Sequence, residues 1–156
     1  MNTKSIAMET QLNEIKLRYS TRQKAADWIK ISSSANAAEA IYKNWDKDHI
    51  ATFETFKILL LNNSNQIKGV FQVSQGGITG TLVDVRLIFA VALKSLAVGM
   101  ILTHNHPSGT LNPSEADKSI TRKIKSAGEF LDIKVLDHII LTPSGKYFSF
   151  ADEGIL

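Results

Sequence analysis

The sequence of 156 residues predicts an α/β domain in which helices flank a mixed β-sheet. Strand and helix patterns alternate over residues 54–150, as expected of such a fold. Two early strand patterns are joined by a short polar turn, which indicates an antiparallel hairpin within the sheet. A chain of this length can bury a core without disulfides, and its 44% of hydrophobic residues is typical of a soluble globular domain.

The first 48 residues are expected to form a helical N-terminal extension of one or two helices. Two runs of apolar residues at helical spacing, 25–29 and 37–42, are separated by a serine-rich loop. We therefore divide the chain into an extension, residues 1–48, and a main domain, residues 49–156.

The main domain opens with a mostly apolar run, residues 56–61, that is typical of a buried strand. A polar turn follows, and residues 67–73 then form the second strand of the expected hairpin. Asp84 is placed to cap a helix whose apolar stripe runs over residues 85–96. The breadth of this stripe indicates a helix that packs on the sheet.

The second half of the domain repeats the alternation. Residues 98–103 predict a strand that ends at His104. The segment from Asn112 to Glu115 predicts a helix start, with Asn112 as the capping residue and Pro113 at the first helical position. Two late strands complete the expected sheet, residues 135–141 and 147–150.

The candidate functional residues lie where the strand of residues 98–103 ends and where the helix that starts at residues 112–115 begins. His104 and His106 lie two residues apart, so their side chains are expected on one face of the strand. After seven intervening residues comes Ser114, which shares a helical face with Asp117. Two imidazoles and one carboxylate leave a fourth position open, as in a catalytic zinc site. Taken singly, a His-x-His pair is often structural and Pro-Ser-x-x-Asp is often only a helix cap.

Together these residues resemble the signature of the JAB/MPN (JAMM) metalloproteases, His-x-His, seven residues, Ser, two residues, Asp. The segments 104–109, His-Asn-His-Pro-Ser-Gly, and 136–140, Leu-Asp-His-Ile-Ile, resemble the bacterial RadC branch. The resemblance covers about residues 50–156. It implies the JAB/MPN fold, with its cytidine-deaminase-like architecture, and a Zn²⁺ ion bound by His104, His106 and Asp117.

The resemblance also implies a zinc-dependent hydrolase that cleaves a peptide or isopeptide bond of an unidentified peptide or protein. Glu54 would be the general base, whereas its ordinary alternative is a solvated carboxylate at a strand edge. Ser114 would hydrogen-bond the oxyanion, and its alternative is helix capping alone. His138 either orients a metal ligand or is a buried structural histidine, and it is not expected to be a ligand.

Composition excludes several other classes of site. The chain has no cysteine, which rules out disulfides, a thiolate nucleophile and the cysteine ligands of zinc deaminases. The amino terminus has no apolar leader pattern, and no apolar run reaches the length of a membrane span, so a cytoplasmic protein without a membrane partner is expected.

A second function to consider is that of a non-enzymatic or DNA-associated module linked to DNA repair or mobile elements. The net charge is +3, and the basic residues of segment 118–125 are interpreted as the solvated face of a helix rather than a nucleic-acid surface. RadC-type proteins usually carry a glycine-dependent helix-hairpin-helix module. Residues 1–68 contain no glycine, so we expect that module to be absent.

Overall fold

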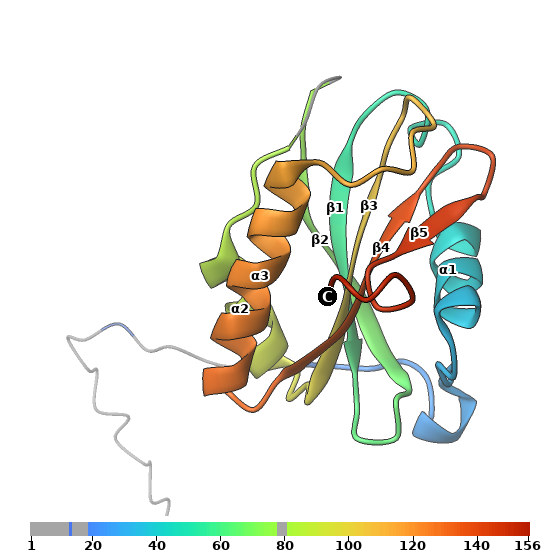
Figure 1. Ribbon diagram of the computed structural model, residues 1–156. Helices are drawn as coiled ribbons and strands as arrows, with labels where there is room; N and C mark the ends of the chain where they lie inside the picture. The colour runs from blue at the N-terminus through green and yellow to red at the C-terminus, as the bar shows by residue number, and fades with distance from the viewer. Residues whose placement is uncertain (1–12, 14–18, 78–80) are drawn as a thin grey trace, which may run out of the picture.

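A computed structural model of the protein describes residues 13, 19–77 and 81–156. Their elements are one 3₁₀ turn, η1 (Ala25–Asp27), the helices α1 (Ser34–Lys43), α2 (Val85–Lys94) and α3 (Glu115–Phe130), and the strands β1 (Thr55–Leu61), β2 (Ile67–Gln75), β3 (Gly99–Asn105), β4 (Lys134–Leu141) and β5 (Tyr147–Ser149). The strands form one sheet in the order β2-β1-β3-β4-β5. Helix α1 covers one face of the sheet, and α2 and α3 cover the other (Figure 1).

The sheet is mixed, as predicted. Strand β1 pairs antiparallel with β2 in the expected hairpin and antiparallel with β3 on its other side. Strands β3 and β4 are parallel, and α3 is the crossover between them. The predicted α/β class is therefore confirmed.

Two cores lie on the two faces of the sheet because successive side chains of a strand point in opposite directions. Leu59 and Leu61 of β1 pack toward α1. Ile58 and Leu60 of the same strand pack toward α2 and α3. All seven residues of β3 are buried, so this central strand holds the first histidine of the candidate site rigidly.

Helix α1 belongs to the first of these cores, together with residues of β1, β3 and β4. It matches the second of the two helical patterns predicted in the extension. The division of the chain at residue 48 stays a prediction, and residues 1–12 and 14–18 of the predicted extension lie outside the described residues.

Of the one or two helices expected in the extension, only α1 forms among the described residues, and residues 25–29 do not form an α-helix despite their apolar spacing. Only the short turn η1 forms there, and the chain then runs extended along the hairpin. The amide of Ile67 donates to the Ile29 carbonyl at 2.8 Å, and the amide of Ile31 donates to the Asn65 carbonyl at 2.8 Å. Pairing with the edge of the sheet satisfies these backbone groups and overrides the local helical pattern.

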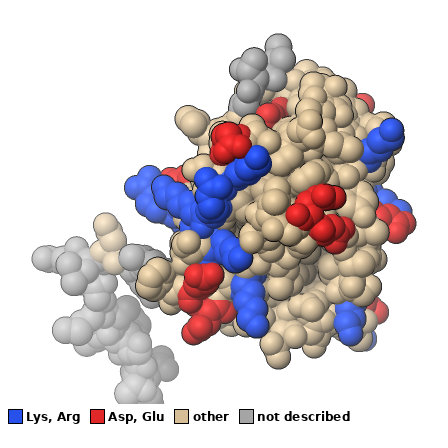
Figure 2. Space-filling model, viewed as in Figure 1, with Lys and Arg blue, Asp and Glu red and all other residues tan. Residues whose placement is uncertain are grey.

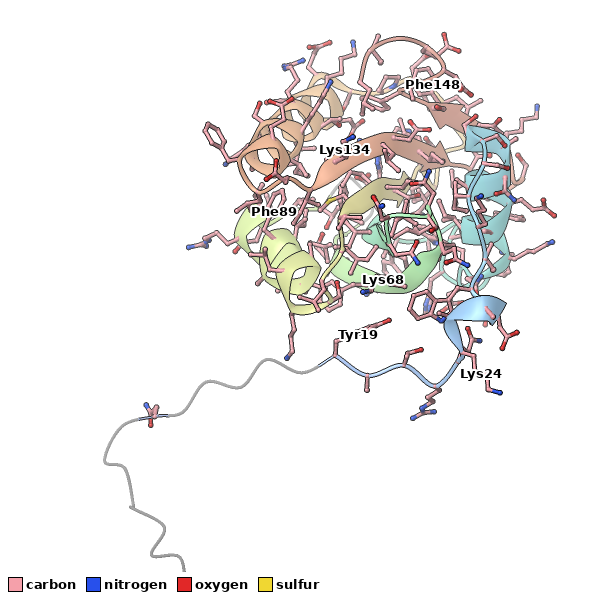
Figure 3. The ribbon with its side chains drawn as sticks, turned by 90° about the horizontal axis from the view of Figure 1, so that it is seen from below. Tyr19, Lys24, Lys68, Phe89, Lys134 and Phe148 are labelled. Carbon is pink, nitrogen blue, oxygen red and sulfur yellow. The ribbon has the colours of Figure 1, made fainter. Side chains whose placement is uncertain are left out.

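Closer to the amino terminus, the same segment also contacts the edge strand β2. Tyr19 lies beside Lys68, and its hydroxyl donates to the Lys68 carbonyl at 2.8 Å (Figure 3). This contact keeps the segment against the sheet.

Both helix starts near the site are capped by side chains. Asp84 caps α2 as predicted, because its carboxylate accepts from the Arg86 amide. Helix α3 begins later than predicted, and its cap is Ser114 rather than Asn112. The Ser114 hydroxyl accepts from the Asp117 amide, and the Asp117 carboxylate accepts from the Ser114 amide, which forms a capping box.

Among the helices of the described residues, none is both long and apolar enough to cross a bilayer.

Candidate metal centre

The candidate centre lies where β3 ends and α3 begins. A crossover helix between parallel strands must start at the carboxyl end of the first strand, so α3 begins on the side of the sheet where His104 emerges. Asp117 occupies the third position of α3 and therefore faces this edge. The β3–α3–β4 connection thus converts spacing in the sequence into proximity in space.

The three predicted ligands converge. Each of His104, His106 and Asp117 offers one atom, and these atoms lie within 4.8 Å of one another. The Nε2 atoms of the two histidines are 3.0 Å apart. Asp117 reaches His104 Nε2 with Oδ1 at 3.3 Å and His106 Nε2 with Oδ2 at 3.6 Å. The structure therefore brings together the three residues that the sequence singled out.

The electrostatic environment favours an ionised carboxylate. Burial by itself would raise the pKa of Asp117, but the neighbouring imidazoles of His104 and His106 hold that pKa far below its usual range. The hydrogen bond with Asp117 in turn raises the pKa of His106. Two imidazole nitrogens beside one carboxylate are a donor set that zinc accepts readily, so the residues present fit such an ion.

One cleft of about 620 Å³ opens beside these ligands. Glu54 and Ser114 line it together with His106 and Asp117. Further lining side chains form its walls: Phe56, Leu82, Val83, Pro107, Ala116 and Ile120. The candidate base, the candidate oxyanion donor and two of the candidate ligands therefore face one space.

Glu54 reaches this cleft because of strand register. It directly precedes β1, which pairs antiparallel with β3 so that Phe56 lies opposite His104. Continuing that register by two residues on each strand brings Glu54 opposite His106. The Glu54 carbonyl also accepts from the Gly76 amide at 2.9 Å, which anchors this point of the chain to the end of the hairpin.

Ser114 is exposed at the amino end of α3. Its hydroxyl oxygen accepts from the Asp117 amide at 3.1 Å. Since a hydroxyl has one proton and can accept at two lone pairs, capping leaves the Ser114 proton free to be donated. Helix capping and donation into the cleft are therefore compatible.

Asn105 is a supporting residue that the sequence analysis missed. It lies between the two histidines, so its side chain points to the opposite face of the sheet. There its Oδ1 accepts from the Thr55 amide at 2.7 Å, and its Nδ2 donates to the carbonyls of Ile50 at 2.7 Å and Phe53 at 2.8 Å. Asn105 thus anchors the segment that carries Glu54 to the strand that carries the histidines.

His138 and Thr121 form a second supporting group. His138 is fully buried, and its Nε2 lies 2.8 Å from Nδ1 of His104. Burial lowers the pKa of His138 well below that of an ordinary histidine. Thr121 contacts the other His138 nitrogen, and the only sequence signal for it is its position one helical turn after Asp117.

Comparison with known proteins identifies the family of this chain. A family model described as RadC-like JAB domain matches residues 31–155. The chain is 50% identical over 139 residues to a UPF0758 protein of Flavobacterium johnsoniae, which covers 89% of this chain and 60% of that protein. It is 47% identical over 103 residues to a UPF0758 protein of Porphyromonas gingivalis and 46% identical over 103 residues to one of Pelobacter propionicus. Each of these two alignments covers 66% of this chain, and 45% and 44% of the respective relative.

The chain thus spans between 44% and 60% of the length of these relatives. The match to the family model runs through most of the described residues and includes α1 as well as the candidate centre. The chain belongs to the family of RadC-like JAB domains.

Proposed function

We propose that this domain is a zinc-dependent metallohydrolase that cleaves a peptide or isopeptide bond. The observation that carries the proposal is the convergence of His104, His106 and Asp117 at one wall of a cleft that Glu54 and Ser114 also line. A binding module would need neither a carboxylate base nor a hydroxyl donor beside three metal ligands.

Zinc suits the donor set, since imidazole and carboxylate are its common catalytic ligands and three protein ligands leave one position for water or substrate. When bound, zinc would supply Lewis acidity, which polarises a carbonyl and lowers the pKa of water from 15.7 to roughly 7.

The residues of the chain would carry the proton and stabilise the developing charge. Glu54 would accept a proton from the attacking water as the new carbon–oxygen bond forms. It would then deliver this proton to the amine nitrogen as the carbon–nitrogen bond breaks. The Ser114 hydroxyl would donate a hydrogen bond to the oxyanion, a type of interaction worth about 3 kcal/mol in other enzymes.

The composition of the cleft supports an amide substrate over a phosphodiester. Neither lysine nor arginine occurs among the described residues that line it, and its titratable lining residues are Glu54, His106 and Asp117. A phosphodiester would therefore find no lysine or arginine in the described lining to pair with its charge, whereas a neutral amide needs none.

Metal analysis combined with an activity screen tests the proposal. The purified protein should hold about one zinc per chain, and Asp117→Ala should lose it. In a screen of peptide and isopeptide substrates, Glu54→Gln should retain zinc and lose hydrolysis. Glu129→Gln, an exposed change at the far end of α3, is the matched control and should behave like the wild type. A wild-type protein that binds no added zinc, or a fully active Glu54→Gln variant, would contradict the proposal.

A second candidate function is nucleic-acid binding, which is supported by one observation. Lysine and arginine side chains gather over α2 and α3, with acidic side chains among them (Figure 2). Two of the basic residues of α3 are already engaged, because Lys118 pairs with Glu115 at 2.8 Å and Lys125 donates to the Leu156 carbonyl at 3.0 Å. These contacts favour the hydrolase.

Binding of duplex DNA at several salt concentrations would measure this second candidate. A phosphate-binding surface should lose affinity steeply as salt rises, and Arg122→Glu with Lys123→Glu should abolish binding. Absence of binding at low salt would exclude it.

A further inference from the structure

A line of buried hydrogen-bonding side chains runs behind the candidate metal centre, from α3 through β4 to the end of β3. It consists of Thr121, His138 and His104. We propose that Thr121 and His138 are positioning residues that hold the proton of His104 on Nδ1 and so present a bare Nε2 to the metal. The role of that Nε2 as a ligand rests on the proposed function, whereas the direction of the hydrogen bonds does not.

The direction is set at Thr121. Its hydroxyl lies 2.6 Å from the Asp117 carbonyl oxygen, which can only accept, so the single hydroxyl proton points there. The same hydroxyl oxygen lies 2.6 Å from Nδ1 of His138. Having used its proton, the hydroxyl can only accept in this second contact. His138 must therefore carry a proton on Nδ1.

His138 relays the same direction of hydrogen bonding to His104. This side chain has no exposed surface and lies between the rings of Phe56 and Phe150, with centroid distances of 5.5 Å and 4.6 Å. A charged imidazolium would be costly in this apolar setting, so the ring is neutral and its Nε2 holds a lone pair. Across the 2.8 Å contact, Nε2 of His138 then accepts from Nδ1 of His104.

The consequence appears at the ligand atoms. With its proton on Nδ1, His104 has a bare Nε2. A backbone carbonyl sets the same state at His106, because Nδ1 lies 2.7 Å from the Thr110 oxygen. Two bare nitrogens 3.0 Å apart, with a carboxylate oxygen 3.3 Å from one of them, repel each other unless a cation lies between them.

The opposite arrangement shows why the direction matters. A proton on Nε2 of His104 would point toward Asp117 Oδ1 and occupy the ligand position. The negative Asp117 carboxylate attracts a proton to Nε2 of His104. Without Thr121 and His138, His104 would therefore favour the Nε2–H tautomer, which cannot bind metal. The hydrogen bonds that His138 accepts from His104 and that Thr121 accepts from His138 oppose this preference.

Two substitutions at one position separate the hydroxyl from the shape of the side chain. Thr121→Val keeps the volume and removes the hydroxyl, whereas Thr121→Ser keeps the hydroxyl. Thr103→Val is the matched control, because Thr103 is also fully buried and its hydroxyl has no hydrogen-bond partner within the described part of the chain. Thermal unfolding verifies that each variant is folded before the other measurements.

The first measurement uses metal-free protein at a pH where the histidines are neutral. Long-range proton–nitrogen correlation spectra of isotope-labelled protein show which nitrogen of each histidine is protonated. We expect Nδ1–H at His104 in the wild type, Thr121→Ser and Thr103→Val, and a shift toward Nε2–H in Thr121→Val. A wild-type His104 that is protonated on Nε2 would overturn the proposal.

The second measurement is zinc affinity by competition with a chelator. Thr121→Val should bind zinc about 10- to 100-fold more weakly, while Thr121→Ser and Thr103→Val stay near the wild type. Equal affinities and equal spectra for Thr121→Val and Thr103→Val would also overturn the proposal. A wild type with the expected spectrum that binds no zinc would refute the metal-dependent function and leave the hydrogen-bond direction established.

Discussion

Ser114 and Asp117 form the capping box of α3 and are also the proposed oxyanion donor and a proposed metal ligand. The Asp117 carboxylate accepts from the Ser114 amide at 2.7 Å through Oδ2, while Oδ1 faces His104. The capping box therefore orients the only acidic member of the candidate ligand set before any metal binds. A carboxylate held by the backbone loses little further freedom on coordination.

Substitution of Ser114 should separate capping from catalysis. Glycine is a good capping residue that costs only a few tenths of a kcal/mol relative to serine, but it has no hydroxyl. If the hydroxyl donates to the oxyanion, Ser114→Gly should lower kcat about 100- to 1,000-fold with little change in stability or zinc content. Steady-state kinetics and denaturant unfolding are the measurements.

Ser114→Thr retains the hydroxyl and serves as the control, with expected activity close to the wild type. A Ser114→Gly variant that hydrolyses substrate at the wild-type rate would restrict Ser114 to helix capping.

Zinc binding should weaken in acid, and the pKa of His106 determines the pH range in which it weakens. The hydrogen bond that the Asp117 carboxylate accepts from protonated His106 raises the pKa of His106 above its ordinary value in the metal-free protein, although partial burial opposes this. Nε2 must lose its proton to bind metal, so zinc affinity should fall as pH drops through this raised pKa.

The metal-free fold has the opposite pH dependence at this residue. Protonated His106 stabilises it fully below the unfolded-state pKa, and the contribution is lost as pH rises through the folded-state pKa. Zinc titrations over a pH series measure this competition between a proton and zinc for Nε2 of His106. A zinc affinity that does not change between neutral and mildly acidic pH would contradict the prediction.

Helix α3 is the element on which the site depends most. Its first turn carries Asp117, its second carries Thr121, and its last turn packs closely on the chain that enters β4. Gly128 permits this approach, since a Cβ there would overlap the Ile133 carbonyl oxygen. The Gly128 carbonyl also accepts from the Ile133 amide at 2.9 Å.

Gly128→Ala should therefore destabilise the fold by about 1–3 kcal/mol, because the clash is with backbone that cannot move aside easily. Gly69→Ala is the control, since nothing lies within 4 Å of an added Cβ in that strand, and its effect should stay within about 0.5 kcal/mol. Chemical unfolding compares the two, and equal stabilities would show that the end of α3 adjusts freely.

The whole molecule should be stabilised by zinc. The three candidate ligands come from β3, the loop after it and α3, so one ion would connect elements that move apart on unfolding. A ligand that binds only the folded state adds about 2.7 kcal/mol at 100 times its dissociation constant. The melting temperature should therefore rise with zinc, fall with a chelator and not respond to either in Asp117→Ala.

Local patterns in the sequence are sufficient for several of these features. Apolar runs bounded by polar turns predict the strands of the sheet, and the period of two along a strand predicts that His104 and His106 share a face. The spacing of Ser114 and Asp117 predicts one helical turn. These features depend on backbone geometry over a few residues, which is why they can be recognised without the fold.

Other features exist only because distant segments meet. Glu54 faces the cleft through the register of β1 on β3, and His138 reaches His104 because β4 lies beside β3. The extended path around Ile29 replaces a helix because an edge strand offers hydrogen bonds to it. Strand order and register depend on interactions across 30 or more residues, as between Ile29 and Ile67 or His104 and His138, so only the folded chain decides which side chains complete the centre.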